Sequence, residues 1–257
     1  ENTTGANSVA VGYQALDANT VGDKNVAVGS GAMGANTTGT TSVAVGHQAL
    51  LLQTIGTGNT AVGSTALDAL TTANNCTAVG LDALGGVTTG IDNTAVGKDA
   101  GKAITTATGN TLVGKGAGDV ITTGSNNTAA GRDALGANTT GASNTAFGKD
   151  AALLNTTGAG ITALGTQALD ANTTGTDNTA VGLDALGANT TGIDNTAVGK
   201  DALLVATTAT SNTMIGARTG DAITTGSNNT GVGRDALGAN TTGAGITALG
   251  TQALDAN

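Results

Sequence analysis

The side chains that most often catalyse reactions are scarce in this sequence. Its 257 residues contain one histidine, His47, and one cysteine, Cys76. His47 directly follows a glycine, where equivalent positions carry Lys, Arg, Ser, Leu or Thr; this indicates exposed surface, without the partners that a general base requires. Cys76 stands where most repeats have asparagine, and no histidine is near it, so we expect a buried free thiol. The sequence predicts no catalytic residue, no cofactor site and no enzyme activity.

Aspartate recurs two residues after a repeated glycine, and such a row of carboxylates could bind Ca²⁺, which takes about six to eight oxygen ligands. The row consists of Asp82, Asp99, Asp133, Asp150, Asp184, Asp201 and Asp235. Five of these directly follow Lys or Arg, so adjacent rows of opposite charge would neutralise each other. A single cysteine also excludes an internal disulfide and a cysteine-based metal site. We therefore favour a solvated row of charges and predict no metal site.

Threonine also recurs at a fixed position, and a flat rank of threonines could order water against ice. The candidate ladder is Thr37, Thr88, Thr139, Thr190 and Thr241. Adjacent strand residues face opposite sides, so each Thr-Thr pair would present only one threonine outward, and a two-column array is not evident. We favour cross-repeat β structure as the role of these threonines and keep ice binding as the alternative function.

These residues are positioned by a repeat of 17 residues without insertions, most visible as Asn-Thr-Ala-Val-Gly at Asn93–Gly97 and Asn178–Gly182. We call its glycine the corner glycine, because we expect a positive φ or a tight corner there. The corner glycines are Gly12, Gly29, Gly46, Gly63, Gly80, Gly97, Gly114, Gly131, Gly148, Gly165, Gly182, Gly199, Gly216, Gly233 and Gly250. A constant interval predicts identical units stacked on one another.

The residues before the corner glycine are typical of a short strand, since they are β-branched and alternate in size. The residue directly before it, the apolar column, is Val in most repeats and otherwise Ala130, Phe147, Leu164, Ile215 or Leu249; we expect it to face inward. The residue two before it, the small column, is mostly Ala; we expect it either to pack closely against another chain or to be a small residue that is exposed or faces inward.

The residue four before the corner glycine, the amide column, is usually asparagine. We predict a buried ladder in which each amide bonds to the next repeat, with simple turn propensity as the alternative. Ile161 and Ile246 in this column favour an inward-facing position. The candidate ladder residues are Asn93, Asn110, Asn127, Asn144, Asn178 and Asn195.

At two further positions after the corner glycine, the side-chain sizes are complementary: a large residue at one accompanies a small or polar residue at the other. Leucine normally stands four residues after it, but where that residue is Gly101, Gly118 or Gly220, an isoleucine follows three residues later. The exchange predicts that both positions fill one interior space at constant volume. The repeat closes with Thr-Thr-Gly, which we expect to be a second short strand.

The composition excludes several classes of protein. The chain has no Pro or Trp and 43 Gly, a composition that would usually suggest disorder. Its net charge of −9 is too low to hold the chain unfolded, and its apolar residues recur at fixed intervals, which a disordered chain does not require. The acidic balance, with a pI of about 4.2, argues against nucleic acid as a partner, and no apolar run is long enough to insert into a membrane. The sequence begins and ends within a repeat, so we expect residues 1–257 to be one array within a longer chain.

Seventeen residues per unit predict an all-β fold, a parallel β-solenoid (β-roll or β-helix) of 15 coils. Helical repeats and coiled coils require other periods.

The pattern Asn-Thr-Ala-Val-Gly-x-Asp/Gln-Ala-Leu-x-Ala-Asn-Thr-Thr-Gly resembles the 17-residue arrays of bacterial surface proteins and phage tail fibres. The segments Ser8–Gly12 and Ser42–Gly46 are also similar to head repeats of trimeric autotransporter adhesins, which are shorter. The resemblance implies an extracellular or virion location, a left-handed roll and often a homotrimer.

Together these observations predict a non-catalytic structural or adhesive rod of a surface adhesin or tail fibre. We expect self-association into a homotrimer or filament, and a host-surface receptor or glycan as a further partner.

Overall fold

The structure, a computed structural model, describes residues 4–255. These residues form two compact units, divided between Asn127 and Thr128. Each unit is described by itself, as unit 1 (4–127) and unit 2 (128–255).

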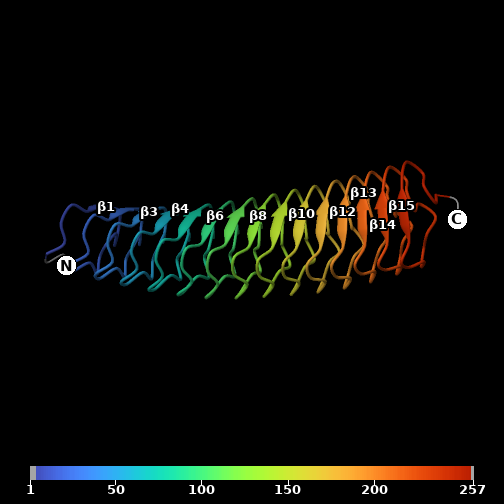
Figure 1. The fold of residues 1–257 in the computed structure, drawn as a ribbon. Coiled ribbons are helices and arrows are strands. Elements are labelled where there is room, and N and C mark those ends of the chain that lie inside the picture. The colour runs from blue at the N-terminus through green and yellow to red at the C-terminus, as the bar shows by residue number, and fades with distance from the viewer. Residues whose placement is uncertain (1–3, 256–257) are drawn as a thin grey trace. The chain divides into compact units, whose positions relative to one another are not determined.

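Every coil contains one strand of three residues, and the strands follow one another at intervals of 17 residues (Figure 1). In unit 1 the strands are β1 (Val9–Val11), β2 (Val26–Val28), β3 (Val43–Val45), β4 (Thr60–Val62), β5 (Thr77–Val79), β6 (Thr94–Val96) and β7 (Thr111–Val113). In unit 2 they are β8 (Thr128–Ala130), β9 (Thr145–Phe147), β10 (Thr162–Leu164), β11 (Thr179–Val181), β12 (Thr196–Val198), β13 (Thr213–Ile215), β14 (Thr230–Val232) and β15 (Thr247–Leu249).

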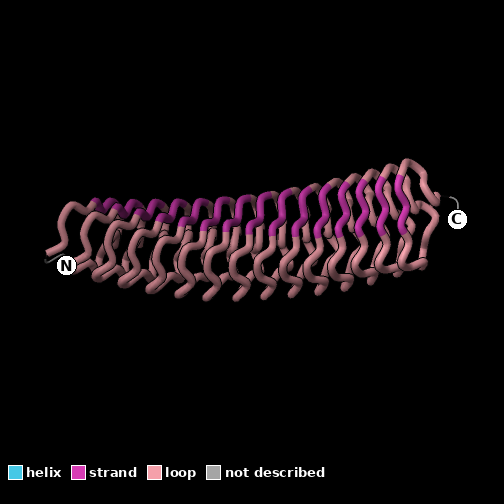
Figure 2. The backbone as a smooth tube through the Cα atoms, in the orientation of Figure 1, coloured by secondary structure: helices cyan, strands magenta, loops and turns pink. Residues whose placement is uncertain are grey.

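Within each unit, neighbouring strands are parallel and pair each residue with its equivalent in the next coil. Thr77 pairs with Thr94 in unit 1, and Thr179 pairs with Thr196 in unit 2. The rest of each coil is turn and loop (Figure 2), and no helix occurs among residues 4–255. The predicted all-β parallel solenoid is confirmed, while its left-handedness stays a prediction.

The prediction that the apolar column faces inward is wrong. Val79 is 37% exposed, whereas Ala78 of the small column is completely buried. In a strand of three residues the middle side chain faces opposite to its two neighbours, so burying Ala78 turns both Thr77 and Val79 outward. In most coils the inward face of the strand holds only a small residue, because leucines and amides from the rest of the coil already fill the narrow interior.

Side chains from different positions of the coil fill the same interior space, as predicted. At Gly118 an added Cβ would lie 2.6 Å from Cδ1 of Ile121 and 2.9 Å from Cδ2 of Leu112. At Gly220 it would lie 2.9 Å from Cδ1 of Ile223 and 3.1 Å from the sulfur of Met214. The small column therefore also takes part, because Leu112 and Met214 occupy it in coils where the usual leucine is glycine.

The Thr-Thr-Gly segment does not form the expected second strand within residues 4–255. The backbone amides of Thr37, Thr38 and Gly39 all donate to one acceptor, the carbonyl of Thr54, at 2.9, 3.1 and 3.3 Å. Three donors converging on one carbonyl make a tight corner, because a parallel ladder distributes its bonds over successive carbonyls.

Candidate functional site

The corner glycines permit the coils to stack closely. All 15 have φ between +122° and +144°, a region that side-chain-bearing residues rarely adopt. A Cβ on Gly182 would lie 2.5 Å from the carbonyl oxygen of Gly199, and one on Gly46 would lie 2.3 Å from that of Gly63. Both expected reasons for glycine, backbone conformation and close approach, therefore apply together.

The amide column forms a buried ladder in each unit. In unit 1 the Oδ1 atom of Asn93 accepts both the backbone amide and the side-chain amide of Asn110, each at 3.0 Å. Asn110 accepts the backbone amide of Asn127 at 2.9 Å. In unit 2 Asn195 bonds to Asn178 in the same way, at 3.0 and 3.1 Å.

Isoleucine is accommodated in this ladder. The backbone amide of Ile161 donates to Oδ1 of Asn144 at 3.0 Å, and its side chain is buried. The column thus faces inward, as the sequence indicated, and its polar atoms are satisfied by the backbone of adjacent coils.

A second buried amide ladder was missed by sequence reasoning. It lies seven residues after the corner glycine, where the side-chain amide of Asn36 donates to Asn19 at 3.0 Å. In unit 2 Asn172 donates to Asn155, and Asn189 donates to Asn172, both at 2.8 Å. The signal was available, because asparagine stands at this position in most coils and is replaced mainly by aliphatic residues.

The candidate threonine ladder is used inside the fold. The hydroxyls of four of its members each donate to the backbone carbonyl of the equivalent threonine in the next coil, at 3.0–3.2 Å: Thr37, Thr88, Thr139 and Thr190. Thr241 supplies the carbonyl that accepts the hydroxyl of Thr224 at 3.1 Å. These hydroxyls are therefore engaged in holding coils together.

A different pair of columns presents threonine to solvent. The second threonine of the closing segment is exposed, and the residue two positions later lies on the same side because the residue between them is buried. Thr38-Gly39-Thr40 and Thr106-Ala107-Thr108 show this arrangement in unit 1. The adjacent coils do not repeat either pair, because Asp23 and Ile55 flank the first and Ile91 and Ser125 flank the second. A continuous two-column threonine array is therefore still not evident.

The two side chains of greatest intrinsic reactivity, His47 and Cys76, differ in their exposure. His47 is exposed, and Cys76 is buried in the amide column, where its thiol donates to the carbonyl of Gly90 at 3.3 Å. Burial raises the pKa of the Cys76 thiol. A thiol with a raised pKa is a weaker nucleophile at neutral pH because less of it is thiolate.

The rows of opposite charge form ion pairs. Lys98 lies 3.0 Å from Asp99, Lys149 lies 2.8 Å from Asp150, and Arg234 lies 2.8 Å from Asp235. Lys200–Asp201 and Arg132–Asp133 pair at 3.5 and 3.4 Å. Hydrogen bonds from these cations lower the pKa of Asp99 and Asp235. Within residues 4–255, no three His, Cys, Asp or Glu side chains form a group that could hold a metal ion.

Fold and side chains together define a β-solenoid repeat protein whose polar groups serve mainly to join coils. No family model, curated protein or solved structure matches the chain. Among the residues described, none lies in a helix with the length and apolarity needed to cross a membrane.

Proposed function

We propose that the chain is a non-catalytic structural and adhesive rod of an extracellular assembly, such as a surface adhesin or a tail fibre. The observation that carries this proposal is that several separate rows of hydrogen bonds join each coil to the next. Strand pairing, the amide ladders and the closing-threonine carbonyls all run between adjacent coils within each unit. Bending or separating coils must break several of these bonds at once, which makes the array stiff.

Self-association is the second part of the proposal. The apolar column leaves a row of branched side chains exposed on the sheet, including Val62, Val79, Val96 and Val113 in unit 1. Contiguous exposed apolar surface of this kind is typical of protein interaction sites. A second copy would present the same row at the same strand spacing, which supports a homotrimer or filament.

Sedimentation velocity tests both parts. We expect a high frictional ratio and concentration-dependent association, weakened in the double variant Val79→Lys/Val96→Lys. Thr72→Lys/Thr89→Lys, at exposed positions on another side of the coil, is the matched control. A compact particle would contradict the rod, and undiminished association of the valine variant would contradict a role for the apolar column.

Ice binding is a second candidate, favoured by the outward threonine pairs Thr38/Thr40 and Thr106/Thr108. Equivalent positions in adjacent coils lie about 4.8 Å apart, and the first of these two columns, the second threonine of the closing segment, carries threonine in most coils. Thermal hysteresis should then fall in Thr106→Glu/Thr108→Glu but not in Lys98→Glu. A wild-type protein without hysteresis would exclude this function.

A further inference from the structure

The row of aspartates on unit 2 is interrupted by a residue of opposite charge. Two residues after the corner glycine, every coil of unit 2 carries aspartate or glutamine except one, in which the residue is Arg218. The residue before it is Ala217, at a position where the preceding coil carries Lys200 and the following coil carries Arg234. Two cations therefore flank a short side chain, and a third cation replaces the usual carboxylate beside it.

These residues form a notch on the surface of unit 2, which we call the arginine notch. It is lined by Lys200, Asp201, Ala217, Arg218 and Arg234, and its volume is about 320 Å³. Equivalent residues of successive coils lie about 4.8 Å apart, so the backbones of Lys200 and Arg234 are about 10 Å apart. The notch thus has room for a ligand group between the charged ends of these two side chains.

A buried carboxylate positions both arginines of the notch. Asp235 is 8% exposed, and every other charged residue among residues 4–255 is more exposed. Its Oδ1 atom lies 2.7 Å from Nε of Arg218, and its Oδ2 atom accepts a hydrogen bond from Nε of Arg234 at 2.8 Å. Hydrogen bonds from Arg234 and Arg218 lower the pKa of the Asp235 carboxyl. One ionised carboxylate therefore holds two guanidinium groups side by side.

The two guanidinium groups keep donors for a ligand. Each uses Nε on Asp235 and carries two further nitrogens with N–H groups, and the side chains of Arg218 and Arg234 are 50% and 64% exposed. Within the described part of the chain, Asp235 is the one carboxylate at ion-pair distance from either of them. Asp221 acts on Arg218 from farther away and does not line the notch. Two arginines that share one carboxylate retain one positive charge.

The third cation of the notch has a carboxylate of its own. Nζ of Lys200 lies 3.5 Å from Asp201, and the lysine side chain is 63% exposed. This pair is neutral as a whole, but the ammonium group has three donors and can also bind an anion above Ala217. The excess of positive charge in the notch therefore comes from the arginines.

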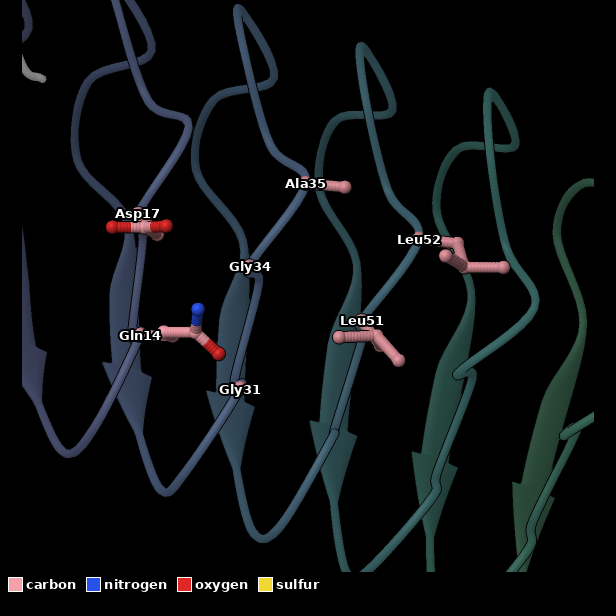
Figure 3. A pocket seen from close by; sticks show the side chains of 7 residues that line it. All are labelled: Gln14, Asp17, Gly31, Gly34, Ala35, Leu51 and Leu52. Atoms are coloured by element: carbon pink, nitrogen blue, oxygen red, sulfur yellow. The ribbon is translucent and has the colours of Figure 1, made fainter.

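Other sites in the two units lack this combination. In unit 2, Arg132 lies 3.4 Å from Asp133, and Lys149 lies 2.8 Å from Asp150, so each cation has one carboxylate. In unit 1, the notch shown in Figure 3 is lined by Gln14, Asp17, Leu51 and Leu52 around two glycines and an alanine. Its one charged lining residue is an aspartate, which repels an anion.

We propose that the arginine notch binds an acidic sugar of a surface glycan through one oxyanion, either a carboxylate or a sulfate ester. This inference rests on the adhesive role proposed above and names its ligand. Terminal nitrogens of a guanidinium group donate paired hydrogen bonds to planar or tetrahedral oxyanions. Arg218 and Arg234 supply these donors, and Lys200 contacts the same oxyanion from the other side of the notch.

The charge of the whole chain favours a ligand with a single acidic group. The net charge is −9, so a polyanion is repelled by the surface outside the notch. A glycan whose neutral sugars end in one acidic sugar avoids this repulsion. A nucleic acid carries a phosphate at every nucleotide and does not fit this distribution of charge.

Titration calorimetry with three soluble sugars tests the proposal. Sialyllactose supplies a carboxylate, lactose sulfate supplies a sulfate ester, and lactose has neither. We expect one or both acidic sugars to bind, more weakly as salt is added, and lactose not to bind. The acidic sugar that binds more tightly identifies the oxyanion.

A conservative substitution separates binding from folding. Arg218→Gln should weaken binding of the acidic sugar at least tenfold, because it removes a charged donor. It should keep the wild-type melting temperature, because Gln167 and Gln252 occupy the equivalent position with φ of +57° and +58°, against +56° for Arg218. Arg132→Gln, outside the notch, is the matched control and should bind like the wild type.

Three results would overturn the proposal. They are a wild-type chain that binds neither acidic sugar, an Arg218→Gln variant that binds as the wild type does, and a short DNA duplex that binds as tightly as the sugars. A high frictional ratio in sedimentation velocity without sugar binding would remove the proposed ligand and leave the rod. A compact particle that still binds the acidic sugar would contradict the rod and support the arginine notch.

Discussion

The Oδ1 atom of Asn93 accepts two hydrogen bonds from a single residue, the backbone and side-chain amides of Asn110 in the next coil. Asn110 in turn donates to the carbonyl of Gly124 at 3.1 Å. One buried side chain therefore joins three coils, and the interior of this solenoid depends on polar bonding as much as on apolar packing.

Asn195→Ala should destabilise unit 2. Asn195 donates to Ala209 at 2.8 Å and accepts the backbone and side-chain amides of Asn212, both at 3.1 Å. Its loss leaves buried donors and an acceptor unpaired, at about 1–3 kcal/mol for each group. Chemical denaturation should show a loss of at least about 2 kcal/mol, and the exposed neighbour Asp194→Asn should show little change. A loss of less than half of this free energy would mean that water replaces the hydrogen bonds made by Asn195.

Gly182→Val should be among the most disruptive single substitutions. It combines a φ of +137° with a Cβ 2.5 Å from the carbonyl oxygen of Gly199, and strain plus overpacking predict a loss of about 2–4 kcal/mol. Gly245→Asn is the matched control, because Gly245 has a φ of +69° that Asn tolerates and has open space around it. Equal melting temperatures for the two variants would contradict the corner as described.

Asp170→Asn should stabilise the protein at neutral pH. Burial, followed by the charge of Asp184, raises the pKa of the Asp170 carboxyl above its ordinary value of 3.8. The folded state then binds a proton more tightly than the unfolded state, so stability is lost as pH rises through the folded-state pKa. The melting temperature of the variant should exceed that of the wild type at pH 7, and the difference should shrink below pH 3.8.

Asp99→Asn should behave in the opposite way. A hydrogen bond from Lys98 and the charge of Lys102 lower the pKa of Asp99, so its contribution is present above pH 3.8 and is lost on acidification. The variant should melt slightly below the wild type at pH 7 and equally at low pH. The same sign for both aspartate variants would contradict these environments.

Leu112→Ala and Gly118→Ala should be coupled. Leu112→Ala opens a buried cavity and should cost about 2–5 kcal/mol. Gly118→Ala places its Cβ 2.9 Å from Cδ2 of Leu112, so it should cost less once that leucine is truncated. A double-mutant cycle that gives simple additivity would argue against a shared interior space.

The period, the strand positions and the corner glycines could be predicted because each depends on a residue type repeated at one interval. Which side of the strand faces inward could not, because a Thr-Ala-Val strand buries either its alanine or its two larger neighbours. Only the space left by the other side chains decides this. In the coil that has Gly118, Leu112 stands where most coils have alanine. This substitution was a usable signal that the middle residue of the strand faces inward.

The left-handed backbone conformation of the interior leucines could not be predicted from residue type either. Leu84 and Leu186 have φ of +52° and +53°, a left-handed conformation that costs leucine roughly 1–2 kcal/mol. Stacked neighbours enforce it, so local propensity is overridden. The glycines at the equivalent positions, Gly101 and Gly118, with φ of +61° and +57°, mark where that strain is relieved.

The closing-threonine bonds connect residues that are 17 positions apart along the chain, as in Thr37 to Thr54. Contacts so near in sequence make the entropy of closing each new loop small and the same every time. Once one coil has formed, its edge acts as a template, and the next 17 residues can settle on it before the remainder has been synthesised. Such low contact order favours rapid, stepwise growth of the array from a single nucleus.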